Sequence, residues 1–549
     1  MPYPGEVKLR CYGDTIAGME QARDPEKARI EQIASAEAIE SAFATAARDL
    51  NYEIGKALKR PADATGTWTV ATIRPFLEEC RALVEKSLRR DASHYSAARW
   101  LWYLRRLPNY KVNAPFAEII SGMAGSSAGR AATCLNDRDP SFPIHESVIR
   151  RVLKFWGGTH YLSGIFGLLR STVVGADFRF SDGATLPSPI LPAEKREAMQ
   201  LFDGRLRASR IDIFNRVGTV IASSNPAPKD SSKAMLIIDR DKHDSRYEPR
   251  FITLEELTAL NEDPCLAGRE WWDPRAGSIA LLLSLAPYLV LTATDGLGQL
   301  HRYGYVVVAQ RDFEVALNEH FGEARAFVAS ALPSATLPTD PDGFISYLDQ
   351  CSGSLWPVRP GPLIRREGVA LCLDLFFATW HLSTLFEYPK EDGGVGNVRA
   401  KHFELAIQKI IDSSPWAPSK DIAKYRRRTL KRNGVKITDI DAIAARGEDL
   451  LLVDCISAFL SSKYETAQYS EVHNAASRIE QKVEKWRRKM TLLRDHPRGD
   501  NYDFSGFRRI IGVVCTTDLF YVPLGSATQF EAPGLRAACS AVELTTWVQ

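Results

Sequence analysis

The segment that decides the fold of this chain is Ile437–Ala458, ITDIDAIAARGEDLLLVDCISA. Two β-rich runs flank Gly447-Glu448, and a two-residue turn with glycine first is typical of a type II′ hairpin. In that register Asp441 lies directly opposite Asp454, with their Cβ atoms roughly 4.5–5.5 Å apart. The sequence therefore predicts an antiparallel hairpin on which two carboxylates face each other.

A third carboxylate is predicted on the same face of this hairpin. Because side chains alternate along a strand, Asp439 and Asp441 share a face with Asp454 and Ile456. Like charges placed directly opposite each other destabilise a sheet. Three carboxylates on one face therefore require a cation, which is either a metal ion or a basic side chain. An ordinary hairpin whose acids pair with arginine or lysine is the alternative interpretation.

Residues from about 395 to 525 resemble the PD-(D/E)XK phosphodiesterase superfamily, which includes many restriction and repair endonucleases. In that family an aspartate begins one strand, and the next strand carries Asp/Glu-x-Lys; Asp441 and Asp454 match the two acids. The segment KHFELAIQKII (Lys401–Ile411) is similar to the family's first helix, whose glutamate corresponds to Glu404. Two later segments complete the likeness as a helix behind the sheet and a buried strand, Ser470–Met490 and Arg508–Pro523.

The resemblance implies a metal-dependent catalytic site. Asp441, Asp454 and Glu404 would hold Mg²⁺ or Mn²⁺, since hard cations prefer carboxylate oxygens and activate water for attack on phosphate. The family's lysine falls at position 456, where this chain has Ile456. Some members of the superfamily supply that lysine from elsewhere. The candidates here are Lys463 in the following loop and two residues of the next helix, Lys482 and Lys485.

Two functions remain open on this basis. The first is a nucleic-acid-binding protein with a divalent-metal-dependent endonuclease domain, by analogy with prokaryotic defence against foreign DNA. The second is a protein-interaction scaffold, in which the nuclease-like domain is catalytically inactive and the N-terminal helical region binds a protein partner. The absence of lysine at position 456 favours the scaffold, whereas the acid cluster and the basic segments beside it favour the nuclease.

The positive charge of the chain is concentrated around this hairpin. Residues 397–512 hold 23 Lys and Arg against 15 Asp and Glu, so they carry +8 and leave −5 for the remainder of a chain of net charge +3. The densest run, Lys420–Lys436, has eight cations and one acid. Neutralising phosphates is the main source of non-specific nucleic-acid affinity. We therefore expect DNA or RNA to contact Lys424, Arg426, Arg427, Arg428, Lys431 and Arg432. A solvated helix face is the alternative for such a run.

Composition indicates a cytoplasmic globular protein. The nine cysteines are odd in number and form no CxxC pair, which is typical of reduced thiols in a cytosol. The N-terminus has no apolar leader. The longest apolar stretch, Ser278–Thr294, has 17 residues and is interrupted by Pro287. Because that length is at the short limit for crossing a bilayer, we expect a buried helix followed by a strand and no membrane contact.

The predicted architecture is multidomain. A mostly helical region, 1–230, precedes a mixed α/β region, 231–390, so strands are expected only in the second. An α/β restriction-endonuclease-like domain, 395–525, and a C-terminal extension, 526–549, follow. Apolar periodicity predicts helices over residues 24–60 and 73–107, and two short helices within His145–Ser171, separated at Gly157-Gly158. The stretch ARWLWYLRRL, residues 98–107, is either core or a surface that stacks on nucleic-acid bases.

Overall fold

The structure is a computed structural model of the 549-residue chain. It describes residues 24–60, 66–108, 117, 120–122, 141–191, 219–222, 249–252, 274–293, 296–331, 333, 335–349, 354–355, 358–359, 362–378, 381, 393–456, 468–517, 520 and 526–549. The predicted domain boundary near residue 390 lies outside these residues.

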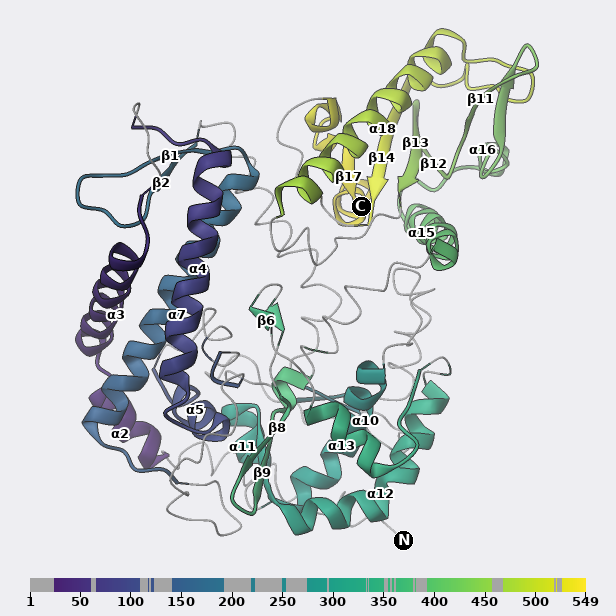
Figure 1. The fold of residues 1–549 in the computed structure, drawn as a ribbon. Helices are drawn as coiled ribbons and strands as arrows, with labels where there is room; N and C mark the ends of the chain where they lie inside the picture. Colours follow the sequence, from purple (N-terminus) through teal and green to yellow (C-terminus); the bar gives the residue numbers. More distant parts are fainter. Residues whose placement is uncertain are drawn as a thin grey trace.

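The N-terminal part is helical, as predicted. Its helices are α2 (Pro25–Ile33), α3 (Ala36–Ala57), α4 (Val70–Ala92), α5 (Ala97–Leu104) and α7 (Glu146–Val173), and α3, α4 and α7 lie alongside one another in Figure 1. The predicted break at Gly157-Gly158 is wrong, because α7 runs through both glycines. A Cβ atom on Gly157 would lie 2.8 Å from the Cα of Phe43, so glycine there allows α3 to approach α7 closely.

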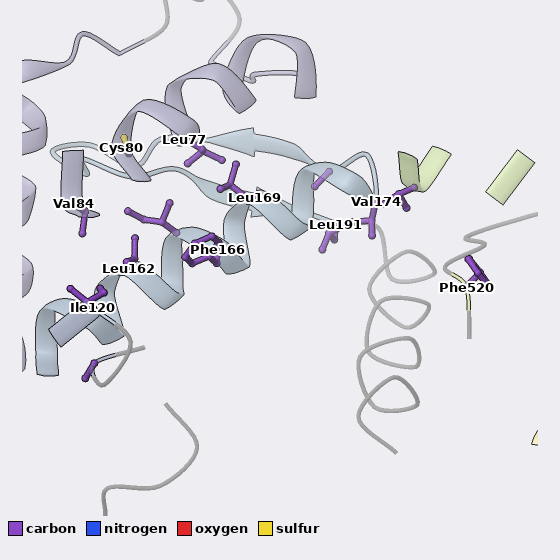
Figure 2. Close-up of a cluster of buried hydrophobic side chains, with 14 of the residues drawn as sticks. Leu77, Cys80, Val84, Ile120, Leu162, Phe166, Leu169, Val174, Leu191 and Phe520 are labelled. Atoms are coloured by element: carbon purple, nitrogen blue, oxygen red, sulfur yellow. The ribbon is translucent and has the colours of Figure 1, made fainter. Parts of the chain in front are cut away.

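Apolar side chains fill the space between these helices. Figure 2 shows Leu77, Cys80 and Val84 of α4 near Leu162, Phe166 and Leu169 of α7. The aromatic stretch of α5 belongs to the same core, since Trp100 and Trp102 are at most 2% exposed. The proposal that this stretch stacks on nucleic-acid bases is therefore wrong. The core interpretation is right, because burial of the large rings outweighs any surface role.

The middle part is a mixed α/β unit. Helices α10 (Pro274–Thr292), α11 (Gly296–Tyr303), α12 (Gln310–Ala331) and α13 (Pro341–Asp349) accompany an antiparallel sheet of order β5-β9-β8, formed by Val306–Ala309, Ala370–Leu373 and Ile364–Glu367. The expected helix-then-strand at residues 278–294 is corrected to one continuous helix, α10, which includes Pro287. No helix among the described residues is long and apolar enough to cross a bilayer.

Among the described residues, five short strand pairs lie outside the larger sheets, and some begin earlier in the chain than predicted. Strands β1 (Asp177–Arg179) and β2 (Ser188–Ile190) pair within the region expected to be helical, residues 1–230. Strand β3 (Thr219–Ala222) also lies in that region, and it pairs with β4 (Pro249–Ile252), which lies beyond its end. Another pair joins β6 (Ser354–Leu355) to β7 (Val358–Arg359). The other two pairs belong to the C-terminal part: one is the β10–β11 hairpin (residues 429–439) described below, and the other joins β15 (Phe530–Ala532) to β16 (Leu535–Arg536).

A buried ionic contact joins the N-terminal helices to the middle unit. The Nη2 atom of Arg105, just after α5, donates to both carboxylate oxygens of Asp374 at 3.0 and 2.8 Å. Arg365 of β8 approaches the same carboxylate at 3.5 Å, and all three side chains are fully buried. Removing one partner from such a contact leaves an uncompensated buried charge, so the contact fixes how these two parts pack.

The C-terminal part is an α/β unit. Helices α15 (Gly393–Asp412) and α16 (Lys420–Ala423) precede the hairpin of β10 (Thr429–Arg432) and β11 (Val435–Asp439). The main sheet has the order β12-β13-β14-β17, formed by Ala442–Arg446, Asp449–Ile456, Arg509–Thr516 and Ala538–Ser540. Strand β12 is antiparallel to β13, whereas β13, β14 and β17 are parallel. Helix α18 (Tyr469–Asp495) connects β13 to β14, and α19 (Ala541–Val548) ends the chain.

The predicted hairpin is confirmed. Ala442 pairs with Val453 and Arg446 with Asp449, which is the register expected from a two-residue turn. Gly447 has φ of 58°, a left-handed backbone that suits the first turn position of type II′. The C-terminal extension is corrected, however: residues 538–540 form β17, which pairs with β14, so this segment is part of the sheet.

Helices cover both faces of the main sheet (Figure 1). On one face Leu451 and Val453 of β13 pack with Phe403 and Ile407 of α15 and with Leu544 of α19. On the other face the alternate residues of β13 and β14 pack against four side chains of α18, namely Ile479, Val483, Trp486 and Met490. A central strand covered on both faces must be apolar throughout, which is why the run LLLV occurs in β13.

The close approach of α18 to the sheet depends on Gly512 in β14. An added Cβ atom there would lie 2.2 Å from Cγ of Met490 and 3.0 Å from Nε1 of Trp486. We therefore expect Gly512→Ala to destabilise the C-terminal unit by about 1–3 kcal/mol, the usual penalty of overpacking. Denaturant unfolding followed by tryptophan fluorescence measures this loss. Gly506→Ala is the matched control, since no atom lies within 4 Å of its added Cβ. Equal stability of both variants would contradict this account of the packing.

Candidate functional site

Asp441 and Asp454 meet at one end of the β12–β13 hairpin. Asp441 comes directly before β12, and Asp454 lies near the end of β13. The alternation of the hairpin turns both toward the face that α18 covers, as the register predicted. The backbone N–H of Cys455 donates to Oδ2 of Asp441 at 2.7 Å and holds that carboxyl in place. Asp454 is buried, which is unusual for a carboxylate and marks it as a candidate functional group.

Burial and neighbouring charge disfavour the ionised form of Asp441. Burial is the largest cause that raises the pKa of Asp441, and the Asp454 and Glu404 carboxyls raise it further. The hydrogen bond from Cys455 opposes them, yet the pKa of Asp441 rises to about 7. A single proton or a cation between the two aspartates would relieve their repulsion.

Glu404 lies in electrostatic contact with this pair from helix α15. Burial raises the pKa of Glu404, Arg427 lowers it, and Asp454 raises it again. Nε of Arg427 lies 3.9 Å from Oε2 of Glu404. Arg427 has φ of 54°, a left-handed backbone that is uncommon outside glycine, and its N–H donates to the carbonyl of Ile440, next to Asp441. Glu404 and the two aspartates thus influence one another electrostatically.

A lysine from α18 reaches the acid pair. Nζ of Lys482 lies 2.9 Å from Oδ2 of Asp454. The side chain at the family's lysine position, Ile456, packs instead against the apolar core beneath α18. Lys463, the loop candidate, lies outside the described residues, and Lys485 is exposed. The lysine that contacts the acid pair thus comes from the helix that follows the hairpin. The apolar spacing of α18 predicts that Val483 is buried, and Lys482 is its neighbour in the chain. That spacing could therefore have indicated that Lys482 lies near the sheet.

The prediction that Asp439 shares this site is wrong. Asp439 ends β11, in a sheet separate from β12 and β13, because the chain leaves one strand and enters the next at residues 440–441. Its carboxylate accepts hydrogen bonds from Thr429 and Lys436. Hydrogen bonding to Lys436 is the main cause that lowers the pKa of Asp439. Asp439 therefore stabilises the β10–β11 hairpin, away from the acid pair.

The Asp441–Asp454 pair fits a cation bound by few protein ligands. Oδ2 of Asp454 is buried and has no hydrogen-bond partner among the described residues, although Lys482 lies close to it. In that part of the chain no group of three or more His, Cys, Asp or Glu side chains is arranged to hold a metal ion. Mg²⁺, however, commonly takes only one or two carboxylates and keeps several waters. Two aspartates suffice for such a site, and direct ligation by Glu404 stays a prediction.

The basic run beside the hairpin is only partly helical. Lys420–Ala423 forms the short helix α16, and residues 429–439 form the β10–β11 hairpin, so the solvated-helix alternative is wrong for most of the run. The missed signal was Asn433-Gly434, a pair that favours tight hairpin turns. Arg426 pairs with Asp412, and Lys436 with Asp439. Among the described residues, no ion pair engages three other cations of the run, Arg428, Lys431 and Arg432.

A second basic cluster, on helix α18, is used largely within the domain; its members are Lys482, Lys485, Arg487, Arg488 and Lys489. Lys482 contacts Asp454, and Nζ of Lys489 donates to the hydroxyl of Thr438 at 3.1 Å. Nε of Arg487 donates to Glu531 at 2.8 Å. Only two members of this cluster, Lys485 and Arg488, are exposed, so the cluster contributes less to the surface than its sequence indicates.

Comparisons with models of known protein families, with curated proteins and with solved structures find no match for this chain. The site is therefore interpreted from its own geometry.

The raised pKa of Asp441 has a consequence for stability. Between the unfolded value of about 3.8 and the folded value of about 7, the folded protein keeps a proton that the unfolded chain has lost. The contribution of Asp441 to the free energy of unfolding is therefore fully present below pH 4 and is lost as pH rises through 7. The other titratable side chains around Asp441 are those of Glu404, Asp454, Lys482 and Cys455. A substitution of Asp441 alone leaves these four side chains in place.

We expect Asp441→Asn to be more stable than wild type above pH 7 in chelator, with a difference that shrinks as pH falls toward 4. The amide oxygen can still accept from Cys455, and the variant has no charge to bury. Calorimetric melts between pH 4 and pH 8 measure the effect, each kcal/mol shifting Tm by about 2–4 °C in a unit of this size. Asp449→Asn, an acid paired with Arg509 at the other end of β13, is the control and should lose stability slightly. A lower Tm for Asp441→Asn at pH 8 would contradict this assignment.

Proposed function

We propose that the C-terminal unit is a metal-dependent nuclease domain that resembles the PD-(D/E)XK superfamily. The observation that carries this proposal is the contact of Lys482 with Asp454, whose carboxyl raises the pKa of the neighbouring Asp441. The order of helix, hairpin, helix and strand, with α15 before the hairpin and α18 behind the sheet, supports it as well. Lys482 would take the role that Ile456 cannot.

Each residue of this site has a separate task. Asp441 and Asp454 would hold a divalent ion, which when bound supplies positive charge at the phosphate and lowers the pKa of water. Lys482 keeps a donor beside Asp454 and would orient the attacking water. Glu404, whose pKa is raised by burial, offers a nearby carboxyl that can accept a proton. Arg427 restrains Glu404 through its guanidinium and contacts Ile440 through its backbone.

The electrostatics favour a catalytic role over a structural ion pair. Burial is the largest cause that raises the pKa of both Asp441 and Glu404, and the Asp454 carboxyl raises both further. A divalent ion beside these carboxyls would stabilise their ionised forms.

The substrate we propose is DNA or RNA in the cytoplasm, contacted by the exposed cations of residues 424–432. The analogy with prokaryotic defence against foreign DNA is part of the same proposal. The alternative is an inactive domain within a protein-interaction scaffold, in which the N-terminal helices bind a protein partner. That alternative is favoured by one observation, the ion pair of Lys482 with Asp454, because it satisfies both charges without substrate.

With Mg²⁺ or Mn²⁺, purified protein is expected to nick plasmid DNA or cut single strands. Asp454→Ala should abolish cleavage, because it removes a metal ligand. Lys482→Ala should lower the rate by about 10²–10⁴-fold, the usual contribution of a positioned proton-transfer group. Gel assays of cleavage against time measure these rates.

Lys485→Ala is the matched control, since this lysine lies one turn along the same helix and is exposed. It should keep the wild-type rate. If wild-type protein cleaves no DNA or RNA with either metal, the inactive-scaffold alternative replaces the nuclease.

A further inference from the structure

The β10–β11 hairpin forms a two-stranded arm outside the main sheet. It pairs Thr429 with Asp439 and Arg432 with Val435, and it belongs to neither face of the four-stranded sheet. Figure 1 shows it beside the β12 edge of the unit. Strand β11 leads directly to Asp441, so the arm and the acid pair share one segment of chain. Asp441 lies six positions after Val435 in the chain, which places Val435 at most about 20 Å from the site.

The tip of the arm is held by a second segment, residues 499–501. Asn433 and Gly434 have φ of 50° and 76°, as in a type I′ turn. Their N–H groups donate to the two carboxylate oxygens of Asp500, at 2.9 and 2.8 Å. Asn501 accepts from the N–H of Lys431 at 2.9 Å and donates to the carbonyl of Thr429 at 2.8 Å. These four bonds fix an exposed ribbon that would otherwise be marginally stable.

The cations of this arm are presented outward. Arg428 and Lys431 are exposed, Arg432 is half-buried, and none of the three has an ion-pair partner among the described residues. Val435, at the tip, is 68% exposed. The acids of the arm and its support are engaged already, since Asp439 accepts from Lys436 and Asp500 from the turn.

From these features we propose that the β10–β11 arm binds duplex DNA, with its tip at the major groove and its cations on the phosphates. The B-form major groove admits a two-stranded ribbon, whereas the A-form groove of duplex RNA does not. An apolar side chain at the tip matches the thymine methyl group, which lies in that groove. A fixed arm about 20 Å from the acids also matches a stiff duplex, which spans that distance in about six base pairs. This inference rests on the proposed function and names its substrate.

Binding in chelator tests the arm without cleavage. Fluorescence anisotropy at several salt concentrations would compare duplex DNA, duplex RNA and single-stranded DNA of equal length. The test variant is Lys431→Gln/Arg432→Gln, and the matched control is Arg446→Gln/Arg508→Gln, an equal loss of charge at the other end of the sheet. We expect the test variant to bind duplex DNA more weakly and to flatten the log–log salt slope by up to about 0.9 per lost contact. The control should bind as wild type does.

The Asp500→Ala variant distinguishes binding by a structured arm from binding that depends on net charge alone. This change makes the protein more positive, so a purely electrostatic surface would bind more tightly. It also removes the acceptor of both turn N–H groups, so a structured arm should bind several-fold more weakly, with folding checked by circular dichroism. Tighter binding by Asp500→Ala would overturn the inference, as would equal losses in the test and control pairs or equal affinity for all three nucleic acids. If wild type binds no nucleic acid, the proposed function fails together with the inference.

Discussion

The repulsion between Asp441 and Asp454, placed opposite each other in a buried hairpin, governs the arrangement of the C-terminal unit. Strand β13 is covered on both faces, so Asp454 cannot turn its charge to water. Burial of an isolated carboxylate is costly, and a second acid opposite raises the cost. The backbone N–H of Cys455 donates to Asp441, and the ammonium group of Lys482 contacts Asp454. Burial and the neighbouring acids also raise the pKa of Asp441. None of these alone neutralises the pair.

The position of Lys482 depends in turn on how closely α18 packs on the sheet. Gly512 leaves room for Met490 and Trp486, and the helix therefore lies close to β14. A larger residue at 512 would displace α18 and with it the lysine on its flank. Packing and chemistry are connected here, because one side of the same helix fills the core while its edge supplies the cation. The site thus depends on a glycine that contacts none of its charged groups.

The basic residues of the C-terminal unit fall into two structural classes. One class, including Arg487, Lys489 and Arg426, is paired with acids or hydroxyls of the same unit and contributes to its internal structure. The other class has no such partner among the described residues, and it includes Lys431 and Arg432 on the β10–β11 arm and Lys485 and Arg488 on α18. Only the second class offers charge to a polyanion, since charges already paired release little when a ligand binds. Net charge alone therefore overstates the cationic surface.

Local pattern was sufficient to determine the hairpin, its register and the helices on either side. Alternation and a glycine turn fix which side chains oppose each other, so Asp441 and Asp454 could be paired from residue numbers. Helix positions also follow from local periodicity, as for α18 and α4. The error at Gly157-Gly158 arose because glycine weakens a helix locally, while close packing of α3 compensates for it in the fold.

Only the tertiary structure decided which cation meets the acids. Lys463 and Lys482 are both plausible by distance along the chain, but helix packing selects Lys482 among the described residues, since its flank lies against β13. The pairing of β17 with β14 and the loss of Asp439 from the site were likewise decided by contacts between distant segments. Sequence pattern encodes periodicity over a few residues, whereas a site built from four elements depends on how those elements pack.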